Sequence, residues 1–289
     1  MTRLIILMVC MVGVGLMISS CETDATVDPP AFVRKPVVVS YISPKDSLVK
    51  VQVAYTEPYF GPYEPQTKFE KSARVSLLDL TDGDSVVLQW RAQDSVYAVD
   101  SFSYKIQNAH RYRLLVVMPN GEQIKSVSTV PPAMKSNDWK VNSWSFKGDT
   151  NQFGEQVYRW NINLENEGAA PGFYYQPMFS FLEGVYFYEG RTWADPGFSL
   201  QKQGNEPLQF IDRGTSWSMM GSGGGSGLVE DLYLLAWVYD QPYQDYFRSQ
   251  FSDDGNPFAE PTLLHSNLEG NALGVFCAYD FAELLIPLK

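Results

Sequence analysis

The chain has 289 residues, of which 45% are hydrophobic and 19% are charged, and its formal net charge is −11 at pH 7. This composition is typical of a globular protein, and the length suits one large domain or two of ordinary size. The acidic balance excludes the basic surface by which proteins bind nucleic acid.

The first 20 residues predict a secretory signal peptide. Arg3 precedes an apolar run over residues 4–18, and two serines, ending in Ser20, lead to Cys21. The run is shorter than the ~20 apolar residues that a transmembrane helix needs. The order of residues resembles a bacterial lipobox, in which cleavage follows Ser20 and Cys21 carries the lipid. The alternatives are secretory cleavage before an ordinary cysteine and a buried N-terminal helix.

Residues 21–35 predict an extended tether, because they contain few large apolar side chains. From residue 36 onward, hydrophobic residues recur with the period of two that is typical of strands. The pairs Asp82-Gly83 and Asn120-Gly121 predict hairpin turns in which both central residues have a positive φ. We therefore expect an antiparallel sandwich, Ig-like or transthyretin-like, over residues 36–130.

Residues 130–132, Val-Pro-Pro, predict a boundary, because two prolines cannot continue a central strand. A second, aromatic-rich β domain is expected over residues 135–289. It should contain one short helix near residues 240–251, in which Asp240 caps the N-terminus. A stripe of aromatic residues spaced by four would pack this helix on the sheet; its members are Tyr243, Phe247 and Phe251.

The sequence predicts no catalytic residue, no cofactor site and no metal ligand. His110 and His265 are the only histidines, and each is expected to be a hydrogen-bonded structural residue. Cys277 is expected to be a small buried hydrophobe. The glycine-rich loop at residues 221–227 matches neither a nucleophile elbow nor a phosphate-binding loop. The acidic segments 79–84 and 252–256 suggest Ca²⁺, but ordinary turns explain both.

Clustered aromatic residues next to glycines suggest a contact patch for a sugar, a peptide or a partner protein. The candidates are Tyr186, Tyr188 and Trp193. The alternative is that strand periodicity buries many of the aromatic side chains of this region in the core.

The C-terminal segments NPFAEP (256–261) and SNLEGNALGVF (266–276) resemble a lipoprotein family of the Bacteroidota, domain of unknown function 4249. Asn271-Ala272 stands where the family usually has Gly-Gly. The resemblance implies a surface lipoprotein encoded beside a TonB-dependent receptor. The acidic residues 22–24 are similar to the signal that exports such lipoproteins to the cell exterior. The resemblance supplies no catalytic residue.

Together, these features predict an outer-membrane lipoprotein that faces the cell exterior and is anchored through Cys21. We expect a non-enzymatic accessory subunit that captures a glycan or peptide ligand for a TonB-dependent nutrient transporter, an outer-membrane β-barrel. Two alternatives remain. One is a surface hydrolase of glycans or peptides, which requires two carboxyl groups about 5–10 Å apart. The other is a structural or adhesive component of an envelope complex.

Overall fold

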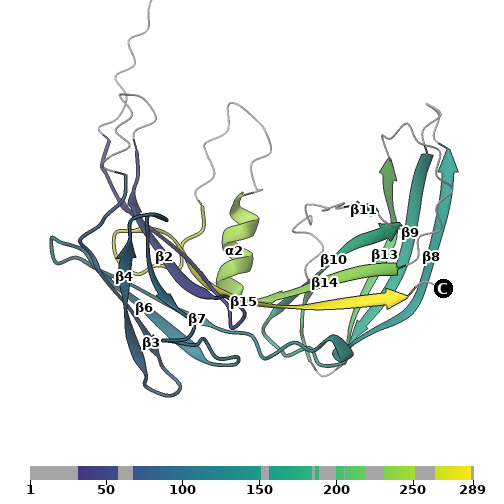
Figure 1. Cartoon of the computed structure of the whole chain (residues 1–289), viewed down its shortest axis with the longest axis horizontal. Coiled ribbons are helices and arrows are strands. Elements are labelled where there is room, and N and C mark those ends of the chain that lie inside the picture. Colours follow the sequence, from purple (N-terminus) through teal and green to yellow (C-terminus); the bar gives the residue numbers. More distant parts are fainter. Residues whose placement is uncertain are drawn as a thin grey trace, which may run out of the picture. The chain divides into compact units, whose positions relative to one another are not determined.

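The computed structural model describes residues 32–57, 68–150, 156–183, 186–188, 200–204, 206–218, 231–250 and 264–287. The chain divides into two compact units, residues 1–33 and 34–289, and the fold described here is that of the second. The predicted signal peptide, with Ser20 and Cys21, lies outside the described residues. The all-β prediction is confirmed, since strands dominate the second unit (Figure 1). The helices described are too short or too polar to cross a membrane.

Seven consecutive strands form the N-terminal part of a 12-stranded sheet: β1 (Pro36–Ile42), β2 (Leu48–Tyr55), β3 (Arg74–Asp79), β4 (Ser85–Arg91), β5 (Val96–Asp100), β6 (Arg111–Val117) and β7 (Gln123–Thr129). Their order is β1-β2-β5-β4-β3-β6-β7, and each adjacent pair is antiparallel. Alternate side chains point into a common core, among them Val51 of β2 and Leu114 of β6, each 1% exposed. The strand period predicted this inward face correctly.

Both predicted hairpin turns are present, but the expectation of a positive φ at both central residues is wrong. Only the glycines have one, at 85° for Gly83 and 86° for Gly121. At the β6–β7 turn, the Gly121 N–H donates to the Met118 carbonyl and the Met118 N–H donates to the Glu122 carbonyl, both at 2.9 Å. The loop therefore has three residues, a length at which a left-handed glycine ordinarily follows a regular turn.

β15 (Leu273–Pro287) joins the N-terminal strands to the rest of the sheet. Its first residues pair in parallel with β1, from Val37↔Leu273 to Ile42↔Ala278, and it pairs antiparallel with β14 (Asp231–Tyr239). The described strand pairs within residues 36–130 are all antiparallel, as predicted, and the parallel pair is formed with the distant strand β15. Parallel neighbours need a long crossover, which the intervening chain supplies. The predicted boundary at residues 130–132 stays a prediction, while β15 pairs with strands from both sides of it.

β10 (Tyr174–Glu183) continues the sheet beyond β14 and pairs with β11 (Tyr186–Tyr188) and β12 (Leu200–Gln201). A separate three-stranded sheet has the order β13 (Leu208–Ser218), β9 (Gln156–Asn166), β8 (Trp139–Thr150), and the short 3-10 helix η2 (Ser136–Asp138) precedes β8.

Helix α2 (Gln241–Gln250) follows β14 and packs against β15 (Figure 1). The predicted cap is confirmed, because the Asp240 Oδ1 atom accepts a hydrogen bond from the Tyr243 N–H at 3.2 Å. The rings of Tyr243 and Phe247 lie 6.1 Å apart, as the predicted stripe requires. Phe251 lies outside the described residues.

The family-like segment 266–276 begins before β15, continues into it, and contacts β1 and β7. The Asn267 side chain accepts from the Phe276 N–H at 3.0 Å and donates to the Phe276 carbonyl at 2.7 Å. Glu269 and Lys125 form a bridge that covers part of the β7 edge. Gly274 has a φ of 117°, and a Cβ atom there would collide with the Val38 carbonyl oxygen. These contacts give the C-terminal motif a structural role.

Candidate functional site

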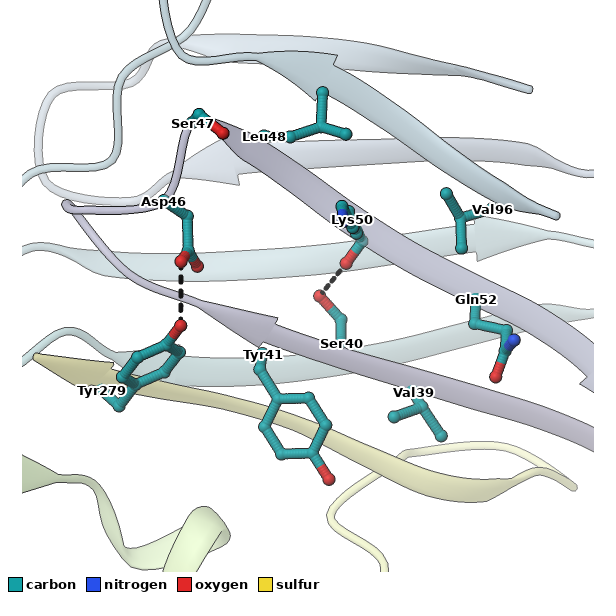
Figure 2. Close-up of a pocket in the computed structure, with 10 residues that line it drawn as sticks. All are labelled: Val39, Ser40, Tyr41, Asp46, Ser47, Leu48, Lys50, Gln52, Val96 and Tyr279. Atoms are coloured by element: carbon teal, nitrogen blue, oxygen red, sulfur yellow. Dashed lines mark hydrogen bonds between the residues drawn. The ribbon is translucent and has the colours of Figure 1, made fainter. Parts of the chain in front are cut away.

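A pocket lies where β1 and β2 separate. Their pairing ends at Val39↔Gln52. Beyond that point, the Ser40 hydroxyl donates to the Lys50 carbonyl at 2.8 Å and bridges the gap between the two strands (Figure 2). The pocket has a volume of about 400 Å³, within the range of small-molecule sites. Its lining residues are Val39, Ser40, Tyr41, Asp46, Ser47, Leu48, Lys50, Gln52, Val96 and Tyr279.

The polar groups of this pocket include one carboxylate and one ammonium. The Tyr279 hydroxyl donates to the Asp46 carboxylate at 2.8 Å (Figure 2). Burial raises the pKa of Asp46, while the bond from Tyr279 and the charge of Lys50 offset part of the effect. Burial also raises the pKa of the Tyr41 and Tyr279 hydroxyls, so both keep their protons at neutral pH. Lys50 is exposed. The pocket therefore offers hydrogen-bond donors, an acceptor and both signs of charge.

The pocket lining favours binding over acid–base chemistry. Asp46 is the single carboxylate among the lining residues, and none of them is a histidine or a cysteine. The Ser40 hydroxyl is already committed to the Lys50 carbonyl. Apolar side chains of Val39, Leu48 and Val96 alternate with the polar groups. This mixture is typical of sites that hold a small polar molecule in one orientation.

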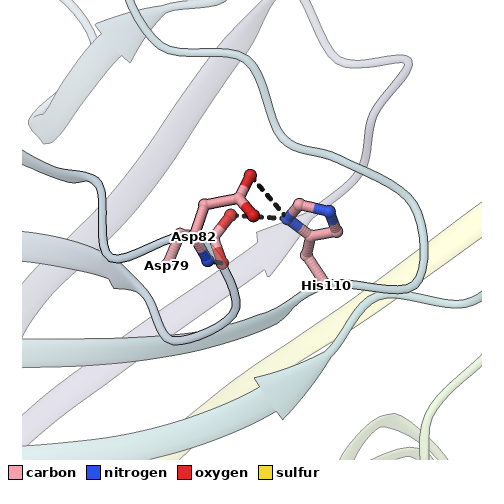
Figure 3. A group of neighbouring side chains, drawn as sticks. All are labelled: Asp79, Asp82 and His110. Atoms are coloured by element: carbon pink, nitrogen blue, oxygen red, sulfur yellow. Dashed lines mark hydrogen bonds and ion pairs between the residues drawn. The ribbon is translucent and has the colours of Figure 1, made fainter.

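A second cluster brings Asp79, Asp82 and His110 together (Figure 3). The His110 Nδ1 atom lies 2.7 Å from the Asp79 carboxylate and 3.7 Å from that of Asp82. This hydrogen bond raises the pKa of His110. Burial alone would raise the pKa of Asp79, but hydrogen bonds from His110 and from the turn N–H groups lower it overall. The expectation that His110 is a hydrogen-bonded residue is confirmed.

The sequence analysis missed this cluster because its members belong to separate segments. Antiparallel pairing of β3 with β6 places Asp79 opposite Tyr112, two residues after His110. A signal in two parts could have revealed it. One part is an acidic hairpin turn at the end of a strand, and the other is a histidine just before the strand that pairs with it.

Two further carboxylates are almost fully buried and act within the fold. The Asp240 side chain, which caps α2, accepts a hydrogen bond from the Ser128 hydroxyl at 2.5 Å, and burial raises its pKa to about 7. Asp280 accepts from the Asn108 amide at 3.1 Å and the Met134 N–H at 3.3 Å, and it pairs with Lys45 at 3.2 Å. Neither carboxylate lines the pocket.

The structure places only some of the predicted site residues. Tyr186 and Tyr188 lie on β11, opposite Glu183 and Phe181 of β10. Trp193 lies outside the described residues. The contact patch formed by these three aromatics therefore stays a prediction, as do cleavage after Ser20 and lipid attachment at Cys21.

The structure also describes Cys277 and His265. Cys277 is fully buried, as predicted, and burial raises the pKa of its thiol well above the usual value. An undissociated buried thiol is a poor nucleophile. The backbone N–H of His265 donates to the Ser249 hydroxyl at 2.9 Å, and its ring lies 3.8 Å from Asp245.

A family model described as "Domain of unknown function (DUF4249)" matches residues 22–284. The matched region includes both the pocket and the Asp79–Asp82–His110 cluster. No curated protein matches the chain.

Proposed function

The chain belongs to the DUF4249 family, and from this premise we propose that it is a lipid-anchored protein that captures a small ligand at the cell surface. The observation that carries the proposal is the pocket between β1 and β2, whose lining combines Asp46, Lys50 and two tyrosines. Such a site can hold a hydroxylated or zwitterionic molecule, such as a fragment of a glycan or a short peptide.

The proposed anchor is a lipid on Cys21, at the end of the signal-like segment. Two acyl chains are enough for stable membrane attachment, because each buried methylene contributes about 0.8 kcal/mol. The net charge of −11 opposes adsorption to anionic head groups, which leaves the acyl chains as the source of attachment.

The proposed partner is a TonB-dependent outer-membrane β-barrel that receives the captured ligand. This part of the proposal comes from the family resemblance and from the acidic residues 22–24 after the lipid site. We propose a non-enzymatic role, because the pocket has one carboxylate where glycoside hydrolysis requires two. A purely adhesive component would need no pocket, so the pocket favours ligand capture over adhesion.

Ligand capture is tested by screening glycan fragments and dipeptides against the purified full-length protein, with thermal stabilisation as the readout. We expect at least one compound to raise the melting temperature in a concentration-dependent way. Lys50→Met should weaken that effect, whereas Lys105→Met, at an exposed position outside the pocket, should not. Equal effects of the two variants would place the binding site elsewhere.

The partner is tested separately by affinity purification of the tagged protein from detergent-solubilised membranes of its own cells. We expect a TonB-dependent β-barrel to co-purify with the wild-type protein and to be depleted with Cys21→Ala. Recovery of no such β-barrel from the wild-type sample would refute the transporter role and leave ligand capture to be judged by the screen.

A further inference from the structure

The Asp79–Asp82–His110 cluster has the composition and geometry of a cation site. We propose that these three side chains bind one divalent transition-metal ion of the Zn²⁺ type. One imidazole nitrogen and two carboxylate oxygens lie within 4.8 Å of one another (Figure 3). The proposal is independent of the pocket and of the proposed function.

The distances suit a metal after small movements. Two ligand atoms at the usual Zn²⁺ distances of about 2.0–2.2 Å, at a tetrahedral angle, lie about 3.4 Å apart. The His110 Nδ1 atom is 2.7 Å from the Asp79 oxygen and 3.7 Å from the Asp82 oxygen, so the two separations fall on either side of this value. Shifts of less than about 1 Å would place all three atoms around one ion.

The carboxylate of Asp79 is held in position before any metal binds. Its Oδ1 atom accepts hydrogen bonds from the Thr81 N–H at 2.8 Å and the Asp82 N–H at 3.3 Å, which leaves Oδ2 directed at His110. The side chain of Asp79 is 5% exposed. Metal sites depend on such outer hydrogen bonds to orient their ligands.

Like the carboxylate of Asp79, His110 is held in position before any metal binds. Its carbonyl accepts from the Val130 N–H at 2.9 Å, and its ring stacks on Tyr112 with centroids 6.4 Å apart. The Tyr112 hydroxyl accepts a hydrogen bond from the Gln107 N–H at 2.8 Å. Tyr112 is fully buried and thus gives the imidazole a fixed neighbour.

The surrounding charge favours a cation. Asp84 belongs to the same turn as Asp82. In the part of the chain that the structure describes, His110 is the one ion-pair partner of Asp79 and Asp82. A bound divalent ion would offset this excess of negative charge. When it binds, the ion takes the Nδ1 lone pair, and any proton on that nitrogen leaves to solvent.

The ligand types select the metal. A neutral imidazole suits Zn²⁺ and its neighbours in the first transition series, whereas Ca²⁺ takes oxygen ligands alone. Three protein ligands leave positions that water would fill. Asp82 is 58% exposed, so one ligand can adjust without disturbing the core.

The test is titration of Zn²⁺ into the purified, chelator-treated full-length protein by calorimetry, with Ca²⁺ in a parallel titration. We expect one Zn²⁺ per chain, with affinity reduced about tenfold or more in Asp82→Asn. The matched control is Asp84→Asn, which removes the same charge from the same turn and should change the affinity by less than about twofold. Because the chain has only two histidines, His265→Gln tests whether the other imidazole contributes to Zn²⁺ binding.

Each outcome decides the question. Loss of Zn²⁺ binding in His110→Gln, with retention in His265→Gln, supports the assignment, and Asp82→Asn replaces His110→Gln if the latter fails to fold. Absence of Zn²⁺ binding overturns it. Equal effects of Asp82→Asn and Asp84→Asn, or Ca²⁺ binding as tight as that of Zn²⁺, also overturn it, because both results indicate nonspecific attraction to acidic residues.

Discussion

At Gly274 the backbone has a φ of 117°, and a Cβ atom would collide with the carbonyl oxygen of Val38 on the adjacent strand β1. The residue lies where β15 begins its parallel pairing with β1. Glycine is therefore required here for two reasons, the backbone conformation and the close approach of a neighbouring strand.

We predict that Gly274→Ala lowers the free energy of unfolding by about 3 kcal/mol or more, because strain at a positive φ adds to overpacking. Gly121→Ala is the matched control, since Gly121 also has a positive φ but faces open space. It should cost about 1 kcal/mol. Urea unfolding of both variants measures the difference, and similar losses would contradict the close-approach argument.

The buried carboxyl of Asp240 predicts a dependence of stability on pH. Burial raises its pKa to about 7, far above the usual value for aspartate. Between about pH 4 and pH 7 the unfolded chain loses this proton while the folded chain keeps it, so the contribution of Asp240 to stability falls as pH rises. Below this range both states are protonated, and above it both are ionised.

We predict that Asp240→Asn removes this trend. The difference in unfolding free energy between wild type and Asp240→Asn should fall by up to about 4 kcal/mol from pH 4 to pH 7. Urea unfolding at several pH values measures it, with the exposed Asp84→Asn as control. A difference that does not change with pH would show that Asp240 ionises normally in the folded protein.

Among the secondary-structure elements, β15 connects several parts of the fold, because it places the Asp280 carboxylate in the interior. This carboxylate connects the turn after β1, the loop before β6 and the segment after β7, through Lys45, Asn108 and Met134. Asp280 thereby connects these three segments to β15.

We predict that Asp280→Ala lowers the free energy of unfolding by about 3 kcal/mol or more, because two half-buried donors lose their fully buried acceptor. The control is Glu283→Ala on the same strand, where the side chain is exposed and the loss should be within about 0.5 kcal/mol. Thermal unfolding compares the two. Equal losses would mean that Asp280 does not hold these segments together.

Local patterns predicted the local elements. Alternation in β2 and β6, the glycine turns and the Asp240 cap of α2 each depend on residues a few positions apart, and each is present. The parallel β1–β15 pair depends on residues at opposite ends of the chain, so no periodicity could reveal it. The pocket and the Asp79–His110 pair are also products of strand pairing, and they were missed for the same reason.

The complete protein is proposed to combine a lipid-bearing N-terminus with a β-structured body that carries a ligand pocket and a cation site. The pocket and the cluster lie on β1–β2 and β3–β6, respectively, so each can be altered without changing the other. The proposed attachment to the membrane would depend on a single residue, Cys21.

Mass spectrometry of the N-terminal peptide of the protein purified from its own cells is the most direct test of that attachment. We predict a peptide that begins at Cys21 and carries the mass of a diacylglyceryl group and a further acyl chain, and an unprocessed, unacylated N-terminus in Cys21→Ala. A wild-type peptide that begins elsewhere, or that contains Cys21 with a free thiol, would contradict a lipid-anchored capture protein.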